Sequence, residues 1–348
     1  MLRNHQPRRL LAAFAAALAL VGLILSPAGA SPLAMNGHQT VPKPAKARIR
    51  LRVRLPFPLP ARAVAPSCGA AQRTTAWLVS TSPRPRPLRL PRIAYPLAAH
   101  RINVLPLVGK GVWITDFPGD RVRIARDVSL ASKDGIDQLW VRVGSTHDGF
   151  YGGAILRALV PLAHARHISV IAWDFPTLAN PAIDARRARL AFQSGADAFS
   201  PDIETPAEGT YLSVARVTQY LARVRSYAGR RAVVATVPQP SLDRLATYPY
   251  AAEAPYIDAF APMVYWSCTE PGAAVANSMK VLSQLRPVLP IGQDYNMASE
   301  GGRHGLPSGQ EIWRFLDVAH RDGAIGASLY DLESGGPVQL HSLAAYPW

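Results

Sequence analysis

Two carboxyl side chains separated by one residue, Asp202 and Glu204, lie in the middle of the chain. Their segment, ADAFSPDIE (196–204), is an apolar run typical of a β-strand, on which residues two apart point to the same side. Two carboxyl groups this close do not both ionise readily, so one pKa rises towards neutrality. A carboxyl that keeps its proton near neutral pH can act as a general acid, as glycosidic cleavage requires. We predict that Glu204 donates a proton and that Asp202 stays charged; pairing of the two acids with nearby arginines is the alternative.

A regular framework surrounds these acids. From residue 107 onward, short apolar runs alternate with segments whose apolar residues recur at helical spacing. One such segment opens with Ser308 and Glu311, a capping box that marks the start of a helix. The eight expected strands are 110–117, 136–144, 168–175, 196–204, 231–239, 257–266, 288–296 and 324–333. The clearest expected helices are 152–167, 213–229 and 308–323.

Strands that alternate with helices pair in parallel through right-handed crossovers. Residues 106–348 span 243 positions, close to the roughly 250 of a (β/α)8 barrel. The alternative, an open doubly wound sheet, normally carries a glycine-rich phosphate turn after its first strand. Here TDFPGDRV follows that strand, without GxGxxG. We therefore predict an α/β fold of the (β/α)8 TIM-barrel type.

Polar and aromatic residues end most of the predicted strands. In a TIM barrel the C-terminal strand ends form the active site. Aromatic rings stack on the C–H faces of sugars and carboxylates accept hydrogen bonds from hydroxyls, so this combination indicates a sugar ligand. Capping of the next helix is the alternative role for some of the acids. The candidate substrate-binding residues are Asp116, Trp173, Asp174, Trp266, Gln293, Asp294, Tyr295, Tyr330 and Asp331.

The basic charge of the chain is confined to its N-terminal part. The formal net charge is +15, yet residues 1–105 carry 16 Lys/Arg and no Asp or Glu. Residues 106–348 carry 22 Lys/Arg against 23 Asp/Glu, a net charge of −1. The predicted barrel therefore lacks the basic surface of a nucleic-acid-binding domain, and we expect no nucleic-acid partner.

The N-terminal part divides into two segments. Residues 1–30 hold an apolar run of 16 residues followed by Ala28-Gly29-Ala30, typical of an export signal. An uncleaved anchor is the alternative, although a membrane span needs about 20 residues. Residues 31–105 are rich in Pro and Arg, which predicts a largely disordered linker. This linker either binds anionic wall polymers or lipid headgroups or is a plain spacer. We expect a secreted or cell-envelope protein.

Two segments of the predicted barrel resemble chitinase-like glycoside hydrolases. DAFSPDIE (197–204) resembles the DGxDxDxE strand of that family, and APMVYW (261–266) resembles its M-x-Y segment. The chain is also similar to barrel lysozymes that cleave bacterial wall glycan and use a D-x-E on the corresponding strand. The resemblance covers residues 109–333 and implies a sugar subsite whose floor is closed near Tyr330 and Asp331.

The same resemblance implies roles for individual residues. Glu204 matches the catalytic acid, Asp202 the carboxylate that orients a substrate acetamido group, and Tyr265 a hydroxyl that helps to hold it. Met263 belongs to the same segment and is expected to contact substrate. The chain departs from the family where Ser200 replaces the middle Asp of the motif and Pro201 interrupts the strand. The S-x-G-G segment of the family is also absent from the third strand, which reads AWDFPT.

These observations predict a secreted glycoside hydrolase that cleaves a polysaccharide containing N-acetylhexosamine, chitin-like or peptidoglycan, by acid catalysis with help from the substrate's acetamido group. The alternative is a carbohydrate- or wall-binding barrel without catalysis. No HxH motif or His/Asp cluster indicates a metal, and no cofactor is expected. Cys68 and Cys268 could pair after export or remain free. The sequence indicates no oligomeric state.

Overall fold

The computed structural model describes residues 100–116 and 121–348. The predicted export signal and the linker up to residue 99 lie outside the described residues. The strands are β1 (Gly109–Ile114), β2 (Gln138–Ser145), β3 (Gly149–Phe150), β4 (Ser169–Phe175), β5 (Ala198–Pro201), β6 (Ala232–Pro238), β7 (Ala259–Val264), β8 (Ile291–Gln293) and β9 (Gly326–Tyr330). The helices are α2 (Arg121–Lys133), α3 (Gly153–His164), α4 (Pro181–Asp184), α5 (Arg186–Gln193), α6 (Val214–Ala228), α7 (Leu242–Thr247), α8 (Tyr250–Glu253), α9 (Pro271–Leu282), α10 (Gly309–Arg321) and α11 (Pro337–Ala345). Short 3-10 turns are η1 (Leu105–Leu107), η2 (Pro206–Glu208), η3 (Ala254–Tyr256) and η4 (Met297–Glu300).

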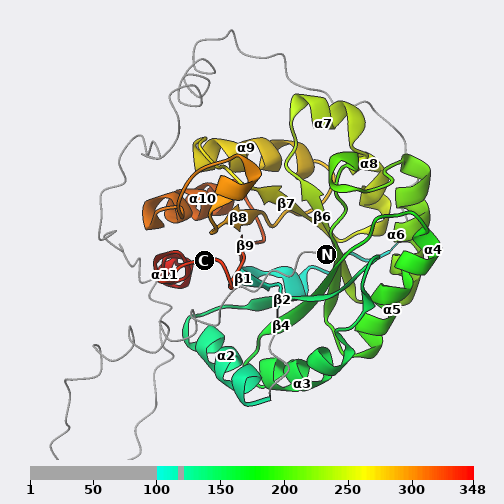
Figure 1. The fold of residues 1–348 in the computed structure, drawn as a ribbon, viewed down its shortest axis with the longest axis horizontal. Helices are drawn as coiled ribbons and strands as arrows, with labels where there is room; N and C mark the ends of the chain where they lie inside the picture. The colour runs from blue at the N-terminus through cyan, green and yellow to red at the C-terminus, as the bar shows by residue number, and fades with distance from the viewer. Residues whose placement is uncertain (1–99, 117–120) are drawn as a thin grey trace, which may run out of the picture. The chain divides into compact units, whose positions relative to one another are not determined.

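Eight parallel strands close into a barrel. The strand order is β1-β9-β8-β7-β6-β5-β4-β2, and β1 also pairs with β2, which removes both edges of the sheet. The helices surround the strands (Figure 1). The short β3 pairs antiparallel with the end of β2 and lies outside this ring of parallel strands. The predicted (β/α)8 barrel is confirmed, and the open-sheet alternative is wrong.

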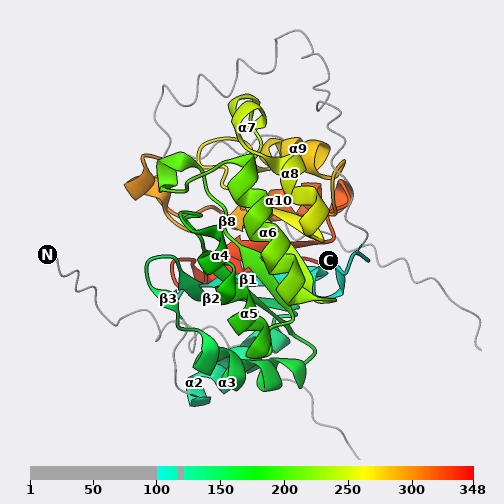
Figure 2. The ribbon, with the colours of Figure 1, turned by 90° about the vertical axis from the view of Figure 1, so that its right-hand side faces the viewer.

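The two ends of the barrel are distinct. We call the C-terminal ends of the eight parallel strands the upper rim and their N-terminal ends the lower rim. Seen from the side, the start of β1 and the C-terminus of the chain lie at one end, and β3 lies at the other (Figure 2). Lys110 of β1 joins this first strand to the last helix, because its Nζ donates to the carbonyl of Ala344 at 2.7 Å. The C-terminal helix therefore lies at the lower rim.

The predicted helices begin and end close to their sequence signals. Residues 308–323 contain α10, whose capping box between Ser308 and Glu311 is present as predicted. The helix α6 starts after Ser213, which accepts a hydrogen bond from the N–H of Arg216, and ends at Gly229 with φ of 59°. Some strands are shorter than predicted. Residues 288–296 supply only β8, because Pro290 immediately before it has no N–H for a sheet ladder.

Alternate strand residues build two apolar layers, one inside the barrel and one between the barrel and its helices. Three tryptophans fill one half of the interior: Trp113 stacks on Trp140 with ring centroids 4.5 Å apart and meets Trp173 at 5.2 Å. The facing strands β5, β6 and β7 contribute small inner residues. They are Ala198, Ala232, Ala259 and Ala261. Because the interior volume of a barrel is fixed, large rings on one side require small side chains on the other.

Aspartates at the lower rim join neighbouring strands. Asp137, Asp197 and Asp258 stand just before or at the start of β2, β5 and β7. Each accepts a hydrogen bond at 2.8 Å from a backbone N–H of the preceding strand. Each also donates its own backbone N–H to the carbonyl of that same residue. The same pair of hydrogen bonds therefore joins neighbouring strands at three places on the lower rim.

Two further features concern the described residues alone. Among residues 100–116 and 121–348, no helix has the length and apolar character needed to cross a bilayer. Cys268, which follows β7, is disulfide-bonded and is not a free thiol. The other cysteine of the chain, Cys68, lies outside the described residues.

Candidate functional site

The upper rim carries Asp202 and Glu204 on one face of the chain. β5 ends at Pro201, and Asp202 continues the pairing through a bridge to Thr236 of β6. The residue between the two acids, Ile203, is fully buried in the outer apolar layer. By strand alternation, both acids therefore face inwards, and both are half-buried.

Burial raises the pKa values of both acids. Burial raises the pKa of Glu204 to about 7, and the charge of Glu208 adds to the rise. Burial and the neighbouring Glu204 raise the pKa of Asp202 well above its usual range, although Arg142 opposes this. Asp202 Oδ1 is buried without a hydrogen-bond partner. A raised pKa for Glu204 agrees with the prediction, whereas the expectation that Asp202 stays charged is not supported.

Aromatic rings surround this pair on the inner wall. Tyr265, which directly follows β7, contacts Tyr330 of β9 with ring centroids 6.0 Å apart, and Tyr295 lies 5.6 Å from Tyr265 and 6.0 Å from Tyr330. Trp173 lies 6.3 Å from Tyr330 and continues the aromatic wall into the barrel. The charges of Asp202 and Glu204 reach Tyr265 and help to raise its pKa, after burial and the neighbouring tyrosines. The structure thus brings Asp202, Glu204 and Tyr265 to one side of the upper rim together with ring faces.

The side chain of Asp174 points away from the barrel interior. Because its neighbour Trp173 faces the barrel interior, Asp174 points outwards to the helix layer, where it is fully buried. It forms an ion pair with Arg187 of α5 and lies 3.4 Å from the hydroxyl of Tyr220. Burial raises the pKa of Asp174 to about 6 even though Arg187 lowers it. The predicted substrate contact of Asp174 is wrong on this geometry; the residue joins β4 to the helices.

Trp266 and Asp294 point outwards for the same reason. Trp266 follows the inward Tyr265, is 1% exposed and packs on Phe315 of α10 at 5.5 Å. Asp294 follows the inward Gln293 and is fully buried, with both carboxylate oxygens unpartnered. Burial and the charge of Asp331 raise its pKa well above the usual range. Neither side chain faces the interior, so neither supplies the expected sugar contact.

Four predicted residues remain: Met263, Gln293, Asp331 and Asp116. Met263 packs on the inner wall below Tyr265. The amide of Gln293 is fully used within the chain, because its Oε1 accepts from the N–H of Ser267 and its Nε2 donates to the carbonyl of Tyr295. Asp331 accepts hydrogen bonds from the backbone and hydroxyl of Ser334 and thereby shapes a turn. Asp116, at the end of β1, is exposed.

Sequence reasoning missed two residues at this rim. Arg142 of β2 lies on the same face as the buried Trp140, a placement that the two-residue period could have indicated. Tyr248 donates its hydroxyl to the carbonyl of Ile203 at 2.8 Å and so holds the segment between the two acids. Tyr248 comes from the loop region after β6, and no local pattern predicts that contact.

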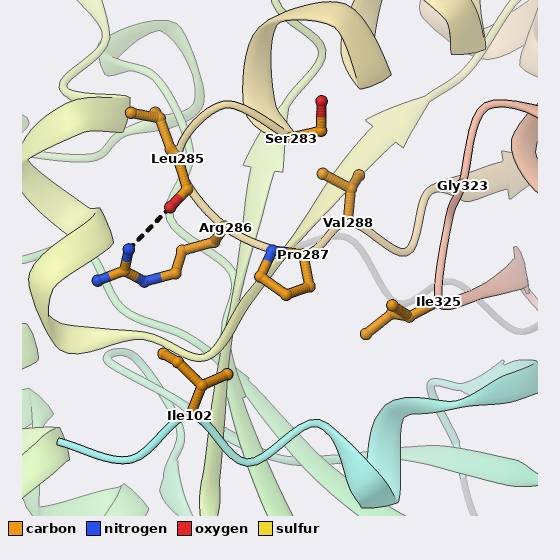
Figure 3. Close-up of a pocket in the computed structure, with 8 residues that line it drawn as sticks. All are labelled: Ile102, Ser283, Leu285, Arg286, Pro287, Val288, Gly323 and Ile325. Atoms are coloured by element: carbon orange, nitrogen blue, oxygen red, sulfur yellow. Dashed lines mark hydrogen bonds between the residues drawn. The ribbon is translucent and has the colours of Figure 1, made fainter.

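A hollow of about 470 Å³ lies at the opposite end of the barrel (Figure 3). Ile102, Val288 and Ile325 contribute apolar lining, and Arg286 turns its guanidinium to the carbonyl of Leu285 at 2.7 Å. The lining contains no acid and no His or Cys. In the described part of the chain, no three His, Cys, Asp or Glu residues are arranged to hold a metal ion. The upper rim is therefore the candidate site.

No protein-family model and no curated protein matches this chain. Solved structures match its fold. The spore cortex-lytic enzyme SleL of Bacillus cereus is 11% identical, with a TM-score of 0.52 over 68% of this chain and 73% of that chain. A chitinase from Chromobacterium violaceum is 9% identical, with a TM-score of 0.52 over 68% and 98%. A β-galactosidase from Marinomonas ef1 is 10% identical, with a TM-score of 0.53 over 68% of this chain and 58% of that chain. The chain thus resembles chitinase-like and wall-lytic barrels in its fold.

Proposed function

We propose that this chain is a glycoside hydrolase that cleaves a polysaccharide containing N-acetylhexosamine, chitin-like or peptidoglycan. One observation carries the proposal: Asp202 and Glu204 face inwards at the upper rim with raised pKa values, and no cation among the described residues lies within hydrogen-bonding reach of them. The fold shared with SleL and with a chitinase supports it. Fold likeness to a β-galactosidase shows why the site, rather than the fold, must identify the substrate.

Glu204 is the proton donor in this proposal. With its pKa raised to about 7, about half of Glu204 holds its proton at neutral pH. It lies two residues beyond Asp202, past the end of β5, and is partly exposed. Its proton passes to the glycosidic oxygen as the bond from that oxygen to the anomeric carbon breaks.

Asp202 and Tyr265 act on the other side of the anomeric carbon. The substrate's own acetamido oxygen attacks this carbon, and the two side chains hold the acetamido group in position for this attack. Water then attacks the anomeric carbon, the bond from this carbon to the acetamido oxygen breaks, and the water gives a proton to the Glu204 carboxylate. The overall reaction adds one water across the glycosidic bond. Tyr330 and Tyr295 supply ring faces for sugar stacking, and the buried Trp173 packs against Tyr330 from inside the barrel.

Ser200 favours the second candidate, a barrel that binds glycan without cleaving it. In the resembling family an Asp occupies this position, next to the catalytic pair. Here Ser200 is fully buried, and its hydroxyl is 2.8 Å from the hydroxyl of Thr236. A neutral hydroxyl pair replaces a charge beneath Asp202, which removes one source of electrostatic tuning from the pair.

Purified full-length protein and Glu204→Gln, each offered soluble chitin oligomers and peptidoglycan, separate the two candidates. Product from the wild type and at least about 100-fold less from Glu204→Gln supports the hydrolase. Glycan binding by both proteins, with product from neither, supports the binding barrel. Asp243→Asn is the matched control, because Asp243 is an exposed acid of α7 whose charge is not among those that shift the pKa of Glu204.

We also propose that the protein is exported, since both polymers lie outside the cytoplasm. The arginine- and proline-rich linker would then hold the barrel near anionic wall polymers or headgroups by charge attraction. Fractionation of cells for the tagged protein, with and without residues 1–30, tests the export. Co-sedimentation of the protein with isolated walls, with and without residues 31–99, tests the linker.

A further inference from the structure

Arg142 is a cation on the inner wall for which the described chain supplies no acid. Alternation along β2 puts it on the same face as Trp140, inside the barrel. Its Nε is buried without a hydrogen-bond partner, and no described carboxylate forms an ion pair with it. A guanidinium carries five N–H donors and keeps its charge at working pH. An arginine that the fold leaves unpaired in a partly buried position needs a reason beyond folding.

A tryptophan holds this guanidinium in place. Trp173 is the register partner of Arg142 on the adjacent strand, and the guanidinium carbon lies 5.5 Å from the centroid of its ring. Trp173 is 3% exposed and itself fixed between Trp113 and Tyr330. Stacking engages the flat face of the guanidinium and leaves its N–H edge available. Arg142 is therefore held in position with its hydrogen bonds unmade.

The surroundings of Arg142 belong to the proposed site. Its charge acts on Asp202 and on Tyr330, which places it near both. Asp148 and Tyr151, beyond the end of β2, also feel its charge. None of these groups is close enough to pair with it. Asp202 and Glu204 serve the proposed cleavage. Arg142 faces the interior near them and has no role in that cleavage.

We propose that Arg142 binds an anionic oxygen group on the sugar, a carboxylate above all, next to the bond that Glu204 cleaves. The proposal rests on the proposed function and deepens it: the substrate is an acidic amino-sugar polymer, such as wall glycan whose sugars carry a lactyl carboxylate, rather than neutral chitin. The planar edge of a guanidinium offers two parallel N–H groups that match the two oxygens of a carboxylate. A neutral polymer has no charged group with which Arg142 could pair.

The test uses three glycans: a neutral chitin oligomer, a peptide-free wall glycan, and the same wall glycan with its lactyl carboxylates amidated. We expect wild-type kcat/KM to be about 10- to 100-fold higher for the carboxylated than for the amidated glycan, because a charged hydrogen bond is lost. Arg142→Gln removes this preference, so that the kcat/KM values for the carboxylated and amidated glycans come within about twofold of each other. Arg142→Lys keeps a point charge and retains part of the preference. Arg189→Gln, on the exposed side of α5, is the control for net charge.

Equal losses on all three glycans with Arg142→Gln would overturn the proposal, because Arg142 would then act on Asp202 rather than on substrate. So would a wild type that cleaves carboxylated and amidated glycans equally well. If the wild type cleaves none of them, the proposed hydrolase fails, and the same comparison is made by binding affinity. Equal affinities for the carboxylated and amidated glycans then overturn the role of Arg142 separately. Thermal unfolding of each variant confirms that it is folded.

Discussion

At the lower rim, Asp137, Asp197 and Asp258 each accept a backbone hydrogen bond at 2.8 Å from the neighbouring strand. At the upper rim, Asp202 Oδ1 is buried with no hydrogen-bond partner among the described residues. An acid that folding requires is satisfied by folding, whereas an unsatisfied buried acid weakens the fold. The comparison teaches that the upper rim keeps acids that stability alone would not retain, as expected of a barrel whose chemistry lies at its C-terminal end.

Removing a lower-rim acid tests the stabilising half of this comparison. Asp258 is fully buried, and its Oδ2 lies 2.5 Å from Arg225 Nη2 while its Oδ1 accepts from the N–H of Asn103. Asp258→Ala leaves the arginine and two backbone N–H groups without this partner, so we expect the free energy of unfolding to fall by about 3 kcal/mol. Urea denaturation measures the loss. The kcat of the folded protein should not change, and a loss under 1 kcal/mol would contradict the assignment.

Asp202→Asn is the matched change at the upper rim. We expect kcat to fall about 100-fold, since the residue holds the acetamido group in position for its attack on the anomeric carbon. The free energy of unfolding should stay within about 1 kcal/mol, because no ion pair is broken. Steady-state kinetics and urea denaturation on the same preparation measure both quantities. Destabilisation as large as that of Asp258→Ala would remove the distinction between the rims.

The pH dependence sharpens the comparison further. Glu204 must hold its proton to donate it, and burial raises its pKa to about 7, so kcat/KM should fall as pH rises above 7, about tenfold per unit. The contribution of Glu204 to the stability of the fold also falls as pH rises. Because the folded pKa lies above the unfolded one, the unfolded chain releases this proton first, and the contribution of Glu204 to stability declines as pH rises from about 4.5 to 7. Glu204→Gln should remove that part of the decline. An unchanged pH profile of stability would contradict the raised pKa.

Two tyrosines offer the finest test, because they differ mainly in the strand end that they hold. Tyr248 donates to the carbonyl of Ile203 at 2.8 Å and Tyr250 to that of Pro238 at 2.9 Å, and their ring centroids lie 4.5 Å apart. Each Tyr→Phe change removes one buried hydrogen bond, which costs about 1 kcal/mol of stability. Only Tyr248→Phe frees the segment between the two acids, so we expect a kcat reduction of up to about tenfold there and less than about twofold for Tyr250→Phe. Equal effects on kcat would show that Tyr248 does not position the acids.

The sequence predicted the barrel and the strand that carries its acids, because both depend on local patterns. Apolar runs, helical spacing and the Ser308 capping box act over a few residues, and the structure has the corresponding elements. The error concerned neighbouring residues at strand ends. Trp173-Asp174, Tyr265-Trp266 and Gln293-Asp294 were each expected to face substrate together, although adjacent strand residues point to opposite sides. The structure turns the first of each pair inwards and buries the second against helices.

By itself, the sequence determined the period of each strand, the parallel alternation with helices and the presence of Asp202 and Glu204 on one face. Only the tertiary structure decided which face points to the axis, since barrel closure and helix packing set the rotation of every strand together. It also decided that Arg187 pairs with Asp174, whereas no cation in the described part of the chain pairs with Asp202, and that Tyr248 reaches the carbonyl of Ile203. These contacts join residues from different elements, and no local spacing encodes distances between elements.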